Sequence, residues 1–363
     1  MRKGVLVWVL ASIVPFAGGC SGEGHGTGHD AGMTGDGGGG TFTAIPNPAL
    51  VVANGGEGTV TIIDPASLTV VSSVPVAAGM HPHHLSVSPD RSRLLVTATS
   101  ADLSMGHSGS GHDGGHGATA GTVVYELHVA SKQLESVITI DATAHNAAFT
   151  PDGSTIVLGM MEHGIVVGRN ASTFAETFRV SGFNMPLEVT PTNVGSLLVA
   201  ESGAARVALV DLASRTVSTR FDVGAVPVAA WASGGTNYFV SVEEGMQLRH
   251  LVEGNANVTL DAHTIEPGGM PGQAILTPNG AELWVAVEDR AVLAVFNATT
   301  HEKLAEFPAG TKPHGIAFEP GGARAFVTDE GGARVLVVNV ATRSISSEIA
   351  VGAKPNGIAW LAR

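Results

Sequence analysis

One short pattern recurs along most of the chain and constrains its fold more than any other feature. A proline or small residue is followed by an alternating segment and a turn, as in the segments from Pro82 to Asp90 and from Ala144 to Gly153. Copies begin at residues 82, 144, 184, 227, 271, 313 and 355. Their spacing is 40 to 44 residues, except for a first interval of 62 that contains a His-, Gly- and Ser-rich insertion at 101–121. A fixed period of this length indicates seven repeated structural units.

Each period contains four short alternating segments separated by turn residues, for example 94–97 as a second segment, 59–63 as a third and 69–76 as a fourth. Four short strands in about 40 residues are typical of one propeller blade. The last copy, from Pro355, holds only a first strand, whereas the copy from Pro48 to Val76 holds only the second to fourth. We therefore predict an all-β, seven-bladed β-propeller of four-stranded blades over 45–363, closed by joining the C-terminal strand to the N-terminal blade.

Two segments and two strand starts match a known repeat. They are 51–64, Ala325 to Glu330, and the Pro-x-Gly tripeptides at Pro313 and Pro355. In these residues the chain resembles the YVTN family of β-propeller repeats, although in blade five 231–235 replaces the usual proline turn. The resemblance implies a propeller fold. It leaves function open, because related propellers include binding proteins, lactonases, cell-surface repeats and the copper-carrying domain of nitrous oxide reductase.

The N-terminal residues predict export. Arg2 and Lys3 precede an apolar segment at 5–16 that is too short to span a bilayer and suits a signal peptide. It ends in Ala17-Gly18-Gly19-Cys20, which resembles the lipobox of bacterial lipoproteins, with Ala17 where leucine is usual. We predict a lipoprotein-type signal peptide at 1–19, lipidation of Cys20 and a location in the bacterial cell envelope, on the periplasmic face or at the outer membrane or cell surface. Plain secretion is the alternative.

Composition narrows the remaining possibilities. The net charge of −13 argues against nucleic acid as a partner, because nucleic-acid-binding proteins carry basic patches. Cys20 is the single cysteine, so the folded part has neither a disulfide nor a cysteine metal site. Residues 20–44 are rich in Gly and His and poor in apolar residues, which predicts a flexible tether. We expect a monomer that touches the membrane only through its lipid.

Histidines cluster where the first strands begin. The innermost strand of each blade starts near the propeller axis, so residues just after each repeat start should line the mouth of the channel. These positions include His83, His84, His145, His314 and, in a weaker copy, Met185. Convergent imidazoles suit zinc or copper, and a thioether favours copper(I). The alternative is that these histidines are only a polar lining of the channel.

The turns between second and third strands should lie on the same face. They carry acidic residues in six blades, and His163 accompanies one of these residues. The acidic positions are Glu57, Glu162, Glu201, Glu243, Glu244, Glu288, Asp289, Asp329 and Glu330. Such a ring would attract cations, although solvated turn residues are the simpler interpretation.

The insertion supplies further histidines, His107, His112 and His116, in a Gly-rich tract that should emerge beside His83 and His84. Short His-rich tracts are typical of metal binding, and the tether repeats the pattern at 24–30. We interpret these as a flexible capture arm. Four further histidines, His128, His250, His263 and His301, are predicted to be ordinary surface or strand residues.

These observations favour an exported, lipid-anchored propeller that binds a zinc or copper ion on one face, as a metal carrier, chaperone or sensor. Its general design resembles that of His-rich periplasmic zinc chaperones, and another envelope protein could be a partner. A cell-surface propeller that binds protein or glycan without metal is the alternative. A lactonase-like or copper-dependent enzyme is a third possibility, but no catalytic motif is present, so no catalytic residue is assigned and activity stays open.

Overall fold

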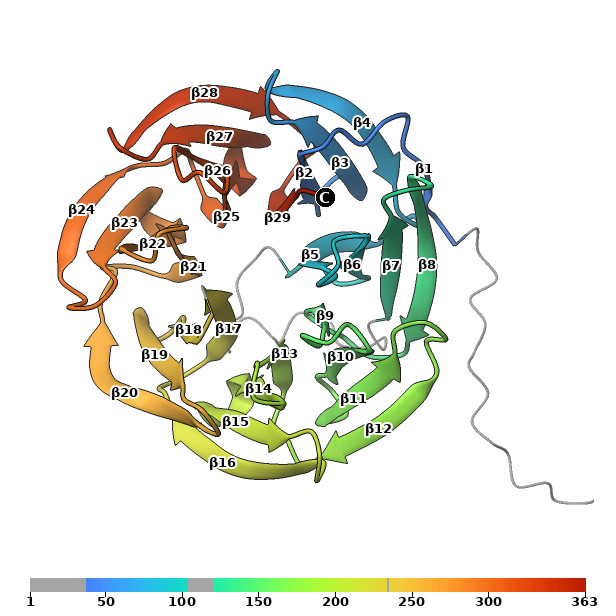
Figure 1. Ribbon diagram of the computed structural model, residues 1–363, viewed down its shortest axis with the longest axis vertical. Coiled ribbons are helices and arrows are strands. Elements are labelled where there is room, and N and C mark those ends of the chain that lie inside the picture. The colour runs from blue at the N-terminus through green and yellow to red at the C-terminus, as the bar shows by residue number, and fades with distance from the viewer. Residues whose placement is uncertain (1–36, 104–120, 234) are drawn as a thin grey trace, which may run out of the picture. The chain divides into compact units, whose positions relative to one another are not determined.

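The computed structural model describes residues 37–103, 121–233 and 235–363. Within these ranges, seven antiparallel sheets are arranged in a ring, each with its first strand innermost (Figure 1). The predicted seven-bladed, all-β propeller is therefore confirmed. The predicted signal peptide, Cys20 and the histidines of the insertion lie outside the described residues.

Each blade is built from its innermost strand outward. Blade 1 contains β29 (Pro355–Leu361), β2 (Ala49–Asn54), β3 (Thr59–Asp64) and β4 (Thr69–Pro75). Blade 2 contains β5 (His81–Val87), β6 (Arg93–Thr99), β7 (Thr122–His128), β8 (Gln133–Ile140) and an additional outer strand, β1 (Gly40–Thr41). Blade 3 contains β9 (Ala147–Phe149), β10 (Thr155–Met160), β11 (Ile165–Asn170) and β12 (Glu176–Ser181).

Blade 4 contains β13 (Pro186–Pro191), β14 (Ser196–Glu201), β15 (Arg206–Asp211) and β16 (Thr216–Asp222). Blade 5 contains β17 (Pro227–Ser233), β18 (Asn237–Val242), β19 (Gln247–Glu253) and β20 (Val258–Ile265). Blade 6 contains β21 (Pro271–Leu276), β22 (Glu282–Val287), β23 (Val292–Asn297) and β24 (Lys303–Pro308). Blade 7 contains β25 (Pro313–Phe318), β26 (Arg324–Asp329), β27 (Arg334–Asn339) and β28 (Ser344–Ala350).

Short 3-10 turns follow the second strands of blades 4, 6 and 7: η2 (Ser202–Ala204), η3 (Glu288–Arg290) and η4 (Glu330–Gly332). In the part of the chain that the structure describes, no helix is long and apolar enough to cross a membrane.

The two ends of the propeller meet in blade 1. The C-terminal strand β29 pairs antiparallel with β2, with Val52 opposite Ile358 and Ala49 opposite Leu361. This pairing joins the last strand of the chain to the first blade, as the split repeat predicts. Closure matters because an open ring would leave unpaired strand edges at its first and last blades.

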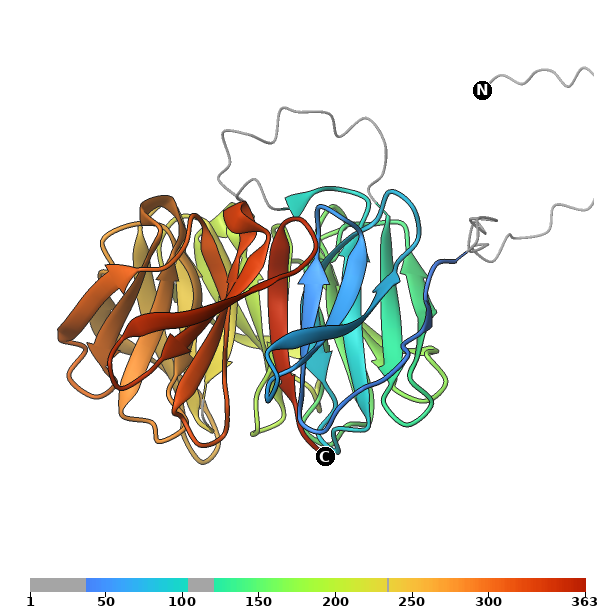
Figure 2. The same cartoon turned by 90° about the horizontal axis from the view of Figure 1, so that it is seen from above.

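The core lies between neighbouring blades, which pack sheet against sheet around the ring (Figure 2). Middle strands are nearly continuous apolar runs because both of their faces are covered, and in β14 all six residues are buried. Outer strands such as β16 are largely exposed. One apolar cluster joins blades 6 and 7 through Trp284, Leu293, Ile316 and Leu336. Burial of this kind is the main stabilising term for the ring.

The last residues of the predicted tether belong to the fold. Gly40 and Thr41 form β1, which pairs with Leu134 and Gln133 on the outer edge of blade 2. The next residue, Phe42, is fully buried in the cluster between blades 1 and 2. The folded unit therefore starts several residues before 45, because an aromatic side chain fixes the chain on the outside of blade 2.

Candidate metal centre

Two adjacent histidines can share one site because β5 is irregular where they lie. Pro82 pairs with Ala98 and His84 with Thr97, so His83 is one residue in excess on the inner strand. In a regular strand, neighbouring side chains point to opposite faces. A bulge breaks that alternation and redirects a side chain. The local irregularity after the proline therefore allows both imidazoles to contact the same group.

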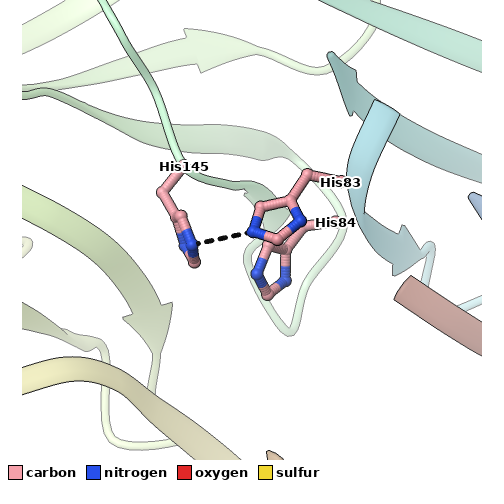
Figure 3. Close-up of side chains that lie close together, drawn as sticks. All are labelled: His83, His84 and His145. Atoms are coloured by element: carbon pink, nitrogen blue, oxygen red, sulfur yellow. Dashed lines mark hydrogen bonds between the residues drawn. The ribbon is translucent and has the colours of Figure 1, made fainter. Parts of the chain in front are cut away.

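That group is the imidazole of His145, which precedes β9 in blade 3. The ring centroid of His145 lies 4.7 Å from that of His83 and 4.4 Å from that of His84. The Nε2 atoms of His83 and His145 are 3.1 Å apart (Figure 3). All three residues are buried, and each offers a ring nitrogen within 4.8 Å of the others. The sequence prediction that histidines of blades 2 and 3 converge near the axis is matched by this geometry.

The spacing of these nitrogens suits a small metal ion. Zinc–nitrogen bonds of about 2.0–2.1 Å in a tetrahedral site place neighbouring donors roughly 3.3 Å apart. The observed 3.1 Å between the two Nε2 atoms is close to that separation. His84 offers a third imidazole nitrogen within 4.8 Å of the donor atoms of His83 and His145.

A buried carboxylate stands behind His145. Glu188 of β13 places Oε2 3.2 Å from Nδ1 of His145 and 3.8 Å from Nε2 of His84. When it is ionised, it accepts the Nδ1–H of His145 and leaves the Nε2 lone pair directed toward His83. Carboxylates commonly orient metal-binding histidines in this way. Burial raises the pKa of Glu188 to about 8, and a cation on the imidazoles would favour its ionised form.

His84 and Glu188 border a cavity of about 270 Å³ on the propeller axis. All seven innermost strands contribute to it, and its polar lining includes His84, Asn146, Glu188, Trp231, Gln273, His314 and Asn356. Trp231 stacks on His84 with ring centroids 5.5 Å apart and an interplanar angle of 23°. Its indole N–H donates to Ser241 and to the carbonyl of Gly272, so the wall beside His84 is held in place.

His314 lies at the edge of this cluster. Its ring centroid is 5.7 Å from that of His83, and its Nε2 is 3.6 Å from Oε1 of Glu288. The ammonium Nζ of Lys312 lies 3.5 Å from Oε2 of Glu288 and 2.5 Å from Oε2 of Glu330. Burial raises the pKa of Glu288 to about 8 even though this ammonium group opposes the shift. The predicted ligand His314 is thus near the three imidazoles but belongs to a mixed network of charged groups in blades 6 and 7.

Met185 occupies a different place from the one its repeat position predicts. The alignment that starts this repeat at Asn184 is offset by two residues, because β13 begins at Pro186. Pro186 pairs with the last residue of β14, as Pro313 does with the last residue of β26. Met185 therefore precedes the strand and packs in an apolar cluster with residues such as Leu187. Aligning the prolines instead would have found Glu188 at the position that His84 has in blade 2.

His163 is exposed in the turn between β10 and β11, beside exposed Glu162. The carboxylate of Glu162 accepts the backbone N–H and the hydroxyl of Thr143, in the linker to β9. This bond confirms that second-strand turns and first-strand linkers share one face. The predicted ligands His107, His112 and His116 fall in the sequence between β6 and β7 and lie outside the described residues.

Carboxylates of the predicted acidic ring hold the linkers that lead into the first strands, because they accept hydrogen bonds from the backbone of these linkers. Glu201 is fully buried, accepts the backbone N–H of Asn184 and pairs with Arg206 and Arg220. Asp329 accepts two linker N–H groups in the same way. Because these carboxylates are already paired, attraction of cations is not their main task.

A second group of metal-ligating side chains lies in the outer part of blades 5 and 6, where the sequence suggests only ordinary residues. His250, Asp261 and His301 each offer one donor atom within 4.8 Å of the others. Burial lowers the pKa of His250 to about 4 and also lowers that of His301, so both rings are neutral at pH 7. Only tertiary structure brings them together, because they come from two blades.

Comparisons with known proteins define the fold and leave the site open. No family model matches the chain, and no curated protein matches it in sequence. Among solved structures, the periplasmic gluconolactonase of Pseudomonas aeruginosa has a TM-score of 0.68 at 18% identity, over 87% of this chain and 99% of that one. A functionally unknown protein of Desulfotomaculum acetoxidans has a TM-score of 0.68 at 15% identity, covering 87% and 99%. A Lactobacillus plantarum protein scores 0.67 at 14% identity, covering 87% and 100%. These likenesses support the seven-bladed propeller fold of the chain.

Proposed function

We propose that this propeller binds a single zinc or copper ion in its central channel and acts as a metal carrier, chaperone or sensor in the bacterial cell envelope. His83, His84 and His145 are the donors, and Glu188 orients His145. One observation carries the proposal: three buried imidazoles from two blades lie with their nitrogens within 4.8 Å of one another. Imidazole is a ligand that both zinc and copper accept.

The neighbourhood of the site suits an ion that is taken up and released. Three protein donors leave one position of a tetrahedral ion for water or a transfer partner. The site borders the axial cavity, from which that position can be reached. The His-rich insertion joins β6 and β7 of the blade that carries His83 and His84, so we infer that it delivers ions to them. The lipoprotein-type leader is the reason for proposing an envelope location.

Metal content tests the proposal. The full chain, purified without a histidine tag, should retain a tightly bound zinc or copper ion in the channel after loading and desalting, and so hold one ion more per molecule than the double variant H83N/H145N. The double variant should lose that channel ion and keep only ions that are bound elsewhere on the chain. H128Q is the matched control, because the half-exposed side chain of His128 lies on β7, the third strand from the axis in blade 2.

Trp231 provides a site-specific readout because it stacks on His84. Loading the central site with Cu²⁺ should quench the fluorescence of this tryptophan, and the quenching should disappear in H83N/H145N. Equal tight stoichiometry in the parent and the double variant would refute the central site. A protein that retains no metal at all would instead favour a propeller that binds protein or glycan.

A lactonase-like hydrolase is a second candidate function. The Glu188 carboxyl, which pairs with His145, borders a cavity of about 270 Å³ that is large enough for a small cyclic ester. A neighbour of the same fold is named as a gluconolactonase. Hydrolysis of a sugar lactone by the metal-free protein, lost in E188Q, would favour this function over metal carriage. Absence of turnover with and without added metal would exclude it.

A further inference from the structure

The second histidine cluster arises from an unusual bulge in blade 5. One residue of β19, His250, lies between the paired positions Arg249 and Leu251, whereas three residues of β20 lie between their partners Thr264 and Leu260. The corresponding outer pair in blade 4 has a single extra residue, between Thr219 and Val217. The wider bulge places Asp261 and His263 opposite His250. Bulges that redirect side chains in this way are frequent beside functional sites.

His250 is held with one nitrogen available to a ligand. Its Nε2 lies 2.9 Å from Oδ1 of Asn237, which accepts a hydrogen bond from that nitrogen. Its ring stacks on Phe239 with centroids 4.6 Å apart. The side chain is 8% exposed, and its Nδ1 has no hydrogen-bond partner among the described residues. The protonated Nε2 leaves the lone pair on Nδ1, which is the arrangement that a metal-binding imidazole requires.

The other donors face the same point. Oδ2 of Asp261 lies 3.9 Å from Nδ1 of His250, which is too long for a hydrogen bond. His301, from the turn between β23 and β24 of blade 6, has its ring centroid 5.2 Å from that of His250. Its buried Nε2 also has no hydrogen-bond partner within the described ranges. Two imidazole nitrogens and a carboxylate oxygen thus lie within 4.8 Å of one another.

Asp261 is positioned by its neighbour. Its Oδ1 accepts the backbone N–H of His263 at 2.7 Å and a hydrogen bond from Nδ1 of the same residue at 2.8 Å. These bonds occupy one carboxylate oxygen and leave Oδ2 directed toward His250. The ring of His263 is 78% exposed and lies 6.3 Å from that of His301. His263 is therefore a positioning residue for the carboxylate.

We propose that His250, Asp261 and His301 form a second, peripheral site for a divalent transition-metal ion, with zinc as the ion that the two-imidazole, one-carboxylate donor set suits best. Tetrahedral zinc needs donors roughly 3.3 Å apart, so Nδ1 of His250 and Oδ2 of Asp261 have to approach by only about half an ångström. The site joins the outer strands of blade 5 to a turn of blade 6. A bound ion would therefore hold two blades together far from the channel, as a structural staple.

Zinc binding by the full chain tests this site independently of the central one. All variants carry H83N/H145N, so two of the three central ligands are absent throughout and a failure of the proposed function cannot affect the result. In this background we expect one equivalent of zinc to remain bound, and the thermal midpoint to rise by about 5 °C at zinc concentrations ~100-fold above the dissociation constant. Adding H301N or D261N should remove both the bound equivalent of zinc and the zinc-dependent rise of the thermal midpoint.

The choice of variants keeps the test decisive. His301 and Asp261 are half-buried, so their amide variants are expected to fold, which circular dichroism checks, whereas His250 is too deeply buried to serve as the main variant. H128Q is the control and should keep the full zinc response. Zinc stoichiometry and thermal shift that are unchanged in both H301N and D261N would overturn the proposal.

Discussion

The carboxylate behind the central histidines offers the sharpest test of how the channel site works. Glu188→Gln replaces one carboxylate oxygen by an amide nitrogen and leaves no cavity. In the parent protein, Oε2 lies 3.2 Å from Nδ1 of His145 and holds the ring with Nε2 available for an ion. The glutamine side chain can either accept from or donate to that nitrogen, so the orientation and tautomer of His145 are no longer imposed.

The expected loss follows from the contact. Removing the partner of a metal-binding histidine typically weakens metal affinity by about 10- to 100-fold. This corresponds to about 1.4–2.7 kcal/mol of binding free energy. All three imidazoles remain in E188Q, so this variant should bind the same number of tight ions per molecule as the parent.

Competition with a chromophoric chelator measures the zinc dissociation constant of each variant. E57Q is the matched control, because Glu57 is an exposed acid of the same face, and its dissociation constant should stay within about twofold of the parent value because exposed charges contribute little. An E188Q protein that binds zinc as tightly as E57Q would refute the role given to Glu188.

Two further predictions concern stability. Phe42→Ala should lower the free energy of unfolding by about 3–5 kcal/mol, because Phe42 is fully buried, and a change below about 1 kcal/mol in urea titrations would contradict its place in the core. Burial alone would raise the pKa of Glu201, but hydrogen bonds from Arg220 and Arg206 hold it below its usual value. The stabilisation from this carboxylate is therefore present above the unfolded-state pKa and lost as pH falls through the lower, folded-state pKa. E201Q should show less loss of stability on acidification than the parent, and identical acid profiles of the unfolding midpoint would argue against it.

Much of the central site was within reach of the sequence. The repeat places His83, His84 and His145 after first-strand starts, and the fold brings starts from neighbouring blades together. Glu188 was missed because the repeat in blade 4 was aligned on Asn184 instead of Pro186, which begins β13. The sequence shows that blade five departs from the repeat at Trp231. It does not show that the Trp231 ring stacks on His84.

The peripheral cluster lay outside what repeat analysis can find. The positions that correspond to His250 and His301 in the other blades do not carry histidine, so the repeat does not mark these two residues as a pair. Their approach depends on the doubled bulge of β20 and on the packing of blade 6 against blade 5. A bulge inserts residues but changes the alternation of apolar and polar residues only slightly. The sequence of a single blade therefore does not reveal it.

By itself, the sequence determined the number of blades, the four-stranded pattern and the closure of the ring. These follow from local alternation, turn residues and a repeated period, which are properties of short segments. Only the tertiary structure decided which side chains meet: the imidazoles with Glu188 on the axis, the paired carboxylates of the linkers, and His250 with His301 at the periphery. The reason is physical, because such contacts depend on strand register, bulges and blade packing, where a shift of one residue turns a side chain to the opposite face.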